Sequence, residues 1–392
     1  MEDFTDMLSK RIWICVAALA LLAASAGIAT AQLSSEQQLG KYLFFDKELS
    51  TPPGQACAAC HGPEVGYTGP DSNINAHGAV YEGAVTGRFG NRKPPASAYA
   101  GNSPIILHQD SNNAWIGGMF WDGRATGWTL GDPLAEQAQG PFLNPLEQNN
   151  PNAKIVVDKV LKSDYKDLFN EVCTDSTKYY ECIARSIAAY ERSSEVSKFT
   201  SKYDKWLDGE ATLTTEEKDG YDLFIGDKAK CNNCHIPPLF TDFTYDNLGV
   251  PKNPENPFYT MPPKWNRDGK NFIDYGLGGF LKNAGYGQDV YMPELGKMKV
   301  PTLRNVDKRP DQGFVKAFSH NGYFKSLESI VHFYNTRDLL HTCGGQYISP
   351  GVDCWPAPEV NQNVNDAEVG DLGLTTTEEA DIVAFLKTLS DE

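Results

Sequence analysis

The sequence contains Cys57-Ala58-Ala59-Cys60-His61 and, 174 residues later, Cys231-Asn232-Asn233-Cys234-His235. Both are complete C-x-x-C-H motifs, the attachment signature of c-type haem. In such a motif the two cysteines bond covalently to the haem, and the adjoining histidine binds the iron. A zinc site or a thioredoxin-like dithiol would also use paired cysteines, but neither explains a histidine at the same place twice. The motifs therefore predict two covalently bound c-type haems, the first held by Cys57, Cys60 and His61 and the second by Cys231, Cys234 and His235.

The N-terminal segment predicts export. Lys10 and Arg11 precede an apolar run from residue 12 to about residue 24, and Ala29-Thr30-Ala31 offers a cleavage site before Gln32. This order is typical of a secretory signal peptide, so residues 1–31 are expected to be removed and the mature protein to reside in the periplasm. An uncleaved membrane anchor is the alternative, although the apolar run is short for a membrane span. No later segment is long and apolar enough to cross a bilayer.

The other cysteines agree with an exported protein. The chain has nine cysteines; Cys15 lies in the signal peptide, and four carry haem. The remaining four form two locally spaced pairs, Cys173 with Cys182 and Cys343 with Cys354. In an exported protein these pairs predict two disulfides, and four free thiols are the alternative. The net charge of −16 repels nucleic acid and favours basic or neutral partners.

The sequence around the two motifs is duplicated. A helix with a capping signal precedes each motif; the signals are Ser34 or Ser35 with Gln37 or Gln38, and Thr214 with Glu217. A helical pattern closes each half, over residues 180–192 and 376–389. This order of elements is the cytochrome c pattern, and strand signals are weak. The predicted fold class is mainly α, with two cytochrome c-like haem domains in tandem (residues 32–200 and 205–392) and long irregular loops.

A dihaem protein could simply relay electrons, whereas a peroxidase also needs an open haem and a nearby acid–base group. Five runs bear on this choice: Phe120-Trp121-Asp122-Gly123-Arg124, E-Q-A-Q-G-P-F-L-N-P-L-E from Glu136 to Glu147, Val300-Pro301-Thr302-Leu303-Arg304-Asn305, His320-Asn321-Gly322, and Asp381-Ile382-Val383-Ala384-Phe385-Leu386. They resemble the bacterial dihaem cytochrome c peroxidase/MauG superfamily, in its MauG/MbnH-like subgroup. The resemblance covers nearly all of the mature chain.

The resemblance implies roles for four residues near the first haem. Glu147 would be the acid–base group over the open N-terminal haem, and Gln137 and Pro141 would line the same pocket. Trp121 would lie between the haems and carry oxidising equivalents between them. Without the resemblance, Glu147 would be read as a solvated loop carboxylate and Trp121 as a core residue. The loop between Trp121 and Gln137 is longer than in the closest family pattern.

The resemblance also implies a calcium ion between the domains. Asn91 would be its side-chain ligand, and the backbone carbonyls of Val315 and Ala317 would complete the protein ligands. Carbonyl ligands tolerate any side chain, so the departure from the family's residues at these two positions is acceptable. Asn91 as an ordinary turn residue is the alternative. His77, in a polar loop after the first motif, is either an additional ligand of the N-terminal haem at rest or an ordinary loop residue.

A further position separates two subgroups of the family. Ser326 can cap a helix in which Leu327, Ile330, Val331 and Tyr334 share one buried face. Tyr334 stands where the resemblance places the sixth ligand of the second haem, a Met in ordinary dihaem peroxidases and a Tyr in the MauG type. A phenolate stabilises oxidised iron, whereas Met stabilises ferrous iron. The alternative is that Tyr334 is core and that Met261, Met292 or Met298 binds the iron.

These features predict an exported, MauG-like peroxidase-type oxidoreductase. Hydrogen peroxide would react at the His61 haem, and the oxidising equivalents would spread through Trp121 and reach a Trp or Tyr side chain of a partner protein. The first alternative is a cytochrome c peroxidase that reduces peroxide with electrons from a small cytochrome or cupredoxin. The second is a dihaem electron carrier without catalysis. A Tyr ligand at position 334, in place of a Met ligand, distinguishes the MauG-like enzyme from the cytochrome c peroxidase. Glu147 distinguishes both of these enzymes from the electron carrier.

Overall fold

A computed structural model of the chain describes residues 32–109 and 114–392. The signal peptide predicted over residues 1–31 lies outside the described residues. The α-helices in the described part are α2 (Ser35–Phe45), α3 (Ser72–Ala76), α4 (Pro133–Leu143), α5 (Ala153–Val160), α6 (Lys166–Val172), α7 (Tyr179–Glu191), α8 (Lys202–Leu207), α9 (Thr215–Ile225), α10 (Gly276–Asn283), α11 (Gln288–Tyr291), α12 (Leu327–Thr336) and α13 (Thr376–Lys387).

The strands are short and form three two-stranded sheets. β1 (Leu107–Gln109) pairs antiparallel with β2 (Ala114–Ile116), β3 (Tyr245–Asp246) antiparallel with β4 (Met298–Lys299), and β5 (His341–Thr342) parallel with β6 (Cys354–Trp355). Long loops connect these elements. The prediction of a mainly helical chain with long irregular loops and little strand is therefore confirmed.

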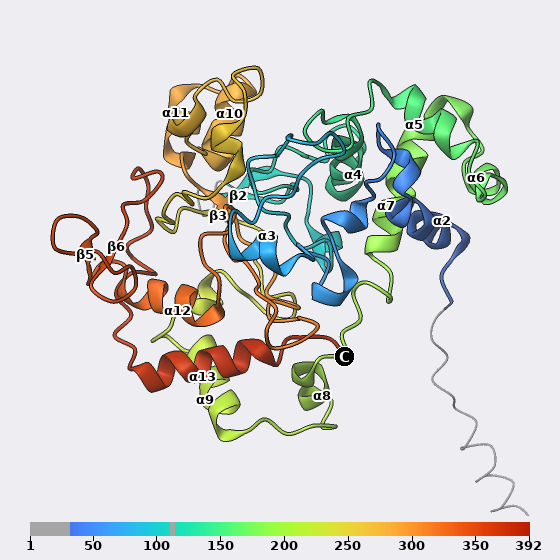
Figure 1. Cartoon of the computed structure of the whole chain (residues 1–392). Coiled ribbons are helices and arrows are strands. Elements are labelled where there is room, and N and C mark those ends of the chain that lie inside the picture. Colours follow the sequence, from blue (N-terminus) through green and yellow to red (C-terminus); the bar gives the residue numbers. More distant parts are fainter. Residues whose placement is uncertain (1–31, 110–113) are drawn as a thin grey trace, which may run out of the picture. The chain divides into compact units, whose positions relative to one another are not determined.

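The expected duplication is visible as two equivalent helix pairs. In the N-terminal half α2 packs against α7, and in the C-terminal half α9 packs against α13 (Figure 1). Each pair consists of the helix before a C-x-x-C-H motif and the helix that closes that half. α7 and α13 agree within two residues with the helices predicted over 180–192 and 376–389.

A glycine allows the closest contact in each pair. A Cβ placed on Gly40 of α2 would lie 1.8 Å from the carbonyl oxygen of Ser186 in α7, and one on Gly220 of α9 would lie 1.9 Å from that of Asp381 in α13. Both distances are far below van der Waals contact, so only glycine fits. Gly40 and Gly220 are thus equivalent positions, and so are Ser186 and Asp381.

Side-chain caps fix where several helices begin. Thr214 and Glu217 form a capping box at the start of α9, as the sequence predicts. Thr375 and Glu378 form a second one at the start of α13. Ser326 caps α12 by accepting a hydrogen bond from the backbone N–H of Ser329.

Both predicted disulfides, Cys173–Cys182 and Cys343–Cys354, are confirmed. Residues 35–392 group into one compact unit, and the domain boundary near residues 200–205 stays a prediction. None of the described helices is long and apolar enough to cross a membrane.

The glycine contact yields a stability prediction. Gly220→Ala forces α9 away from α13, and overpacking of this kind typically costs about 1–3 kcal/mol, occasionally more. We expect a lower midpoint of urea unfolding, followed by circular dichroism. Gly90→Ala is the matched control, because nothing lies within 4 Å of a Cβ at Gly90. An unchanged midpoint for Gly220→Ala would show that the helices do not pack this closely.

Candidate functional site

Each C-x-x-C-H motif forms one tight turn. The first begins with a 3₁₀ turn at Cys57–Ala59 and the second with one at Cys231–Asn233. The backbone N–H of His61 donates to the carbonyl of Cys57 at 3.0 Å, and that of His235 donates to the carbonyl of Cys231 at 2.9 Å. The turn therefore brings both cysteines and the histidine of each motif into one compact loop.

The two motif histidines are held in the orientation that an iron ligand needs. Nδ1 of His61 lies 3.1 Å from the carbonyl oxygen of Tyr67, and Nδ1 of His235 lies 2.9 Å from that of Phe240. A carbonyl only accepts, so each Nδ1 carries the proton and Nε2 keeps its lone pair. Burial lowers the pKa of His61 to about 4 and lowers the pKa of His235. Burial therefore favours the neutral form of both rings, which is the form that metal binding requires.

The motif cysteines do not behave as a redox or zinc pair. All four are free thiols, although the other four cysteines among the described residues form disulfides. Burial raises the pKa of Cys60 and that of Cys231 to about 12, the opposite of a reactive dithiol. Within residues 32–109 and 114–392, neither motif brings its two cysteines and its histidine onto one possible metal position. These observations favour haem attachment over both alternatives.

A cavity of about 220 Å³ lies against the second motif. Its walls include Cys231, Cys234 and His235, and also Leu327, Ile330, Val331 and Tyr334 of α12. The last four are the residues that the sequence predicts to share one buried face. They do share a face, but that face forms a cavity wall. An apolar cavity beside a free Cys-Cys-His turn fits a haem.

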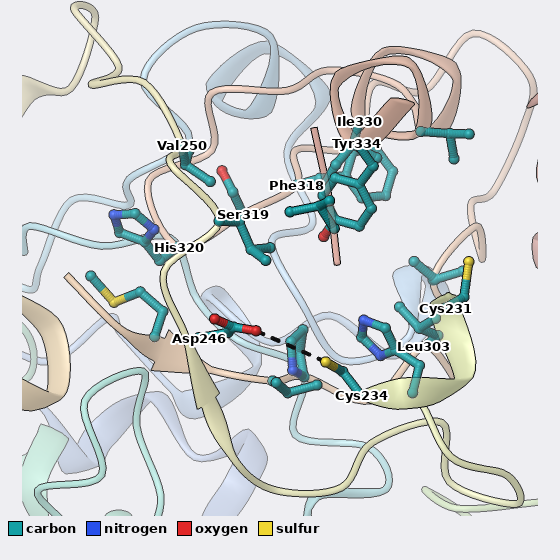
Figure 2. A pocket seen from close by; sticks show the side chains of 18 of the residues that line it. Cys231, Cys234, Asp246, Val250, Leu303, Phe318, Ser319, His320, Ile330 and Tyr334 are labelled. Carbon is teal, nitrogen blue, oxygen red and sulfur yellow. Dashed lines mark hydrogen bonds between the residues drawn. The ribbon is translucent and has the colours of Figure 1, made fainter. Parts of the chain in front are cut away.

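Tyr334 faces the motif across this cavity. Figure 2 shows Tyr334 and Ile330 on one side of the cavity and Cys234 with Asp246 on the other. Burial raises the pKa of Tyr334, so the phenol keeps its proton until a metal displaces it. Of the three alternative methionines, Met298 also lines the cavity, whereas Met261 packs with Phe258 and Tyr259. The side chain of Met292 is 47% exposed.

Two acids beside the second motif were not predicted. Oδ2 of Asp246 lies 4.0 Å from Sγ of Cys234, and Glu368 belongs to the same cluster. Glu368 also accepts a hydrogen bond from Asn233 inside the motif, at 2.8 Å. Glu368 follows the motif by more than 130 residues, and no local sequence signal connects it to the motif.

Trp121 borders two cavities. Its side chain is 7% exposed and lines both the 220 Å³ cavity and a second cavity of about 60 Å³. The indole Nε1 donates to the carbonyl of Lys93 at 2.9 Å, which fixes the ring. The ring centroid of His320 is 6.4 Å away. His320, the first residue of the His320-Asn321-Gly322 run, also lines the larger cavity.

Helix α4 and the turn after it carry the predicted distal residues. Gln137 and Pro141 are four residues apart in α4 and therefore share a face. Glu147 follows in the next turn, where its Oε2 accepts a hydrogen bond from Nδ2 of Asn144 at 3.0 Å. The charge of Glu147 raises the pKa of both Cys57 and Cys60. Glu147 is thus close to the first motif.

The environment of Glu147 favours a carboxyl that can hold a proton. Burial raises its pKa, while the positive charge of Arg124 and the hydrogen bond from Asn144 oppose that rise. Within the described part of the chain, Oε1 has no hydrogen-bond partner. One oxygen therefore fixes the side chain, and the other is available for proton transfer.

The extended loop before α4 has its own anchor, which the sequence analysis missed. The carboxylate of Glu136 accepts hydrogen bonds from the backbone N–H groups of Gly127, Thr129 and Leu130, at 2.6–2.8 Å. A single acid thereby ties the loop after Trp121 to α4, the helix of the distal residues.

The remaining predicted residues have ordinary partners. His77 is exposed, and its Nδ1 lies 2.8 Å from the carbonyl oxygen of Asn73. Nδ2 of Asn91 donates to Asp274 at 3.3 Å, and the carbonyl of Val315 accepts from Asn75 at 3.1 Å. Ala317 is buried beside the larger cavity. The calcium site stays a prediction.

Comparisons with known proteins agree with this geometry. A family model described as di-haem cytochrome c peroxidase matches residues 34–212. The methylamine utilization protein MauG of Paracoccus denitrificans is 33% identical, over 96% of this chain and 95% of that protein. The chain belongs to the di-haem cytochrome c peroxidase family. Cytochrome c551 peroxidase of Nitrosomonas europaea, also similar, is 28% identical over 91% of this chain and 80% of that protein.

Solved structures of the family share the fold. The diheme peroxidase BthA from Burkholderia thailandensis E264 superposes with a TM-score of 0.74 at 30% identity, over 92% of this chain and 87% of that one. A MauG-like protein associated with microbial copper homeostasis superposes with a TM-score of 0.65 at 25% identity, over 94% and 92%. Membership of this family implies two haem cofactors and a peroxidase-type oxidoreductase.

Tyr334 offers a direct test of the second site. If it ligates the iron at His235, Tyr334→Phe leaves that position open or water-bound, and the optical and EPR spectra of the C-terminal haem change. Tyr334→Met should instead raise the reduction potential of that haem, because a thioether favours ferrous iron. Met261→Leu is a control in the separate Phe258–Tyr259 cluster. An unchanged low-spin spectrum in Tyr334→Phe would show that Tyr334 is not the iron ligand, and Met298 would then be the candidate.

Proposed function

We propose that this protein is an exported periplasmic enzyme that uses hydrogen peroxide to oxidise a Trp or Tyr side chain of a partner protein at long range. The position of Tyr334 carries the proposal, because it puts a phenol across the cavity from the second motif. A phenolate ligand disfavours reduction of the iron. Such a site suits the sharing of oxidising equivalents better than the uptake of electrons at high potential.

Two c-type haems would be held covalently, one by Cys57, Cys60 and His61 and the other by Cys231, Cys234 and His235. When bound, they supply the iron at which peroxide is reduced and the conjugated system that stores oxidising equivalents. Calcium at Asn91, with the carbonyls of Val315 and Ala317, remains part of the proposal.

The protein's own contribution at the first haem is proton handling. Peroxide must lose a proton to bind ferric iron well, and its distal oxygen must gain one to leave as water. Oε1 of Glu147 is free to take that proton, while Oε2 is held by Asn144. Gln137 and Pro141 of α4 would shape the space in which the transfer occurs.

Trp121 would connect the two haems. Its indole borders both cavities and is fixed through Nε1. An aromatic side chain that is easily oxidised can pass single electrons between centres that do not touch. The partner's electrons would then reach either haem.

A second candidate is a cytochrome c peroxidase that draws electrons from a small cytochrome or cupredoxin. Met298 in the wall of the same cavity favours this alternative, since Met ligation raises a haem's potential. Relatives of both kinds exist: MauG in Paracoccus denitrificans and cytochrome c551 peroxidase in Nitrosomonas europaea.

The acid–base assignment can be tested by Glu147→Gln, which keeps the size of the side chain and its contact with Asn144 but removes the base. General acid–base groups contribute about 10²–10⁴-fold, so we expect the peroxide-induced spectral change to slow by that range in stopped-flow mixing. Haem content and resting spectra should match those of the wild type. Glu210→Gln, which makes the same change at an exposed acid outside α4 and the motifs, is the matched control. A wild-type rate in Glu147→Gln would exclude this role.

Sharing between the haems can be tested by Trp121→Phe. The His61 haem should still react with peroxide at the wild-type rate, because Glu147 is untouched. Phenylalanine is much harder to oxidise, so the spectral change at the Tyr334-ligated haem should be delayed or lost. Rapid-freeze EPR follows the two haems separately. Simultaneous oxidation of both haems in Trp121→Phe would show that electrons pass by another route.

A further inference from the structure

Among the described residues, the histidine of the first motif has a side-chain hydrogen-bond partner, whereas the histidine of the second motif has none. Nδ1 of His61 lies 3.1 Å from the carbonyl oxygen of Tyr67 and 3.2 Å from Oγ of Ser97. Since the carbonyl only accepts, Nδ1 carries the proton. Ser97 must then accept from His61, and its own hydroxyl hydrogen is free to donate to a third group.

A buried acid, Glu191, ends α7 in this region. Its side chain is 3% exposed, and Oε2 has no hydrogen-bond partner among the described residues. Burial raises the pKa of Glu191 to about 8, and a hydrogen bond from Ser97 opposes that rise. Glu191 also raises the pKa of Cys57, which places it beside the first motif. A buried acid with an unpartnered oxygen therefore lies within reach of the Ser97 hydroxyl.

The duplication shows what the second half has at the same positions. Gly40 meets Ser186 and Gly220 meets Asp381 in the same way, so α7 and α13 align with Ser186 opposite Asp381. Five residues further on, Glu191 corresponds to Leu386.

The loops align as well. The backbone of Pro95 acts to raise the pKa of His61, and the backbone of Pro301 acts in the same way on His235. Two residues further on, Ser97 corresponds to Leu303. Leu303 and Leu386 both line the cavity at His235. One half therefore has a serine and an acid where the other has two leucines.

We propose that Ser97 and Glu191 form a positioning relay that strengthens His61 as an iron ligand and lowers the reduction potential of the N-terminal haem, whereas Leu303 and Leu386 leave His235 without such a relay. A hydrogen bond accepted from the distant ring nitrogen makes an imidazole a stronger electron donor to its metal. A more strongly donating histidine stabilises ferric iron and favours peroxide cleavage at that haem. The inference deepens the proposed function, because it accounts for which of the two haems reacts with peroxide.

Four variants of the full-length, haem-loaded protein test the relay. Glu191→Leu installs the residue of the second half, and Ser97→Ala cuts the relay but keeps the acid. Ser97→Thr retains the hydroxyl and should restore the wild-type behaviour. Glu195→Leu is the matched control, because Glu195 is a nearby acid that pairs with Lys41 and not with Ser97.

The readout is spectroelectrochemical titration of each haem, with resonance Raman spectra of the iron–histidine stretch. We expect Glu191→Leu and Ser97→Ala to shift the potential of the N-terminal haem upward and to lower its iron–histidine frequency. The C-terminal haem is the internal reference, and Tyr334→Phe identifies its signals. Unshifted N-terminal potentials in both variants, equal shifts at both haems, or an equal shift in Glu195→Leu would overturn the relay.

Two precautions keep the result interpretable. If Glu191→Leu fails to fold, the comparison of Ser97→Ala with Ser97→Thr decides alone, because neither of these variants changes the buried acid. The measured potentials need neither peroxide nor a partner protein. A protein that does not react with peroxide would therefore contradict the proposed function but not the relay. Unshifted haem potentials in the variants would contradict the relay but not the proposed function.

Discussion

The contact of helix on helix at Gly40 and Gly220 is the constraint on which both haem sites depend. Each glycine lets a closing helix approach the helix before the motif until its backbone carbonyl touches the glycine. The motif turn follows one helix, and the residues around the motif histidine come partly from the other. The spacing between these helices therefore determines what surrounds each histidine, and the same scaffold could be duplicated with different side chains at the critical positions.

A buried ion-pair network fixes the region between the two haem sites. Arg92 contacts Asp122 at 2.8 Å and Asp274 at 2.6 Å, and it joins residues of both halves of the chain. Burial would raise the pKa of Asp274, but the charge of Arg92 holds it well below the ordinary value. Removing one partner of such a buried group leaves an uncompensated charge. Because Asp122 directly follows Trp121, the network also holds the indole between the two cavities.

Local signals in the sequence predicted the elements that depend on neighbouring residues. The capping box of Thr214 and Glu217, the cap at Ser326 and the pairing of Cys343 with Cys354 are all confirmed. Periodicity also identified the apolar face of α12, but it could not distinguish a core face from a cavity wall, since both exclude water. The face that includes Tyr334 therefore became informative only when the cavity was seen.

The residues that sequence reasoning missed are those that meet only in the fold. Ser97 and Glu191 are 94 residues apart in the chain, and a serine before one helix and an acid at the end of another are individually unremarkable. Their meaning comes from the comparison of the two halves, in which Leu303 and Leu386 occupy the equivalent places. The two halves of a duplicated fold can be compared directly. By our proposal, Ser97 and Glu191 against Leu303 and Leu386 are the differences that set the chemistry of each haem.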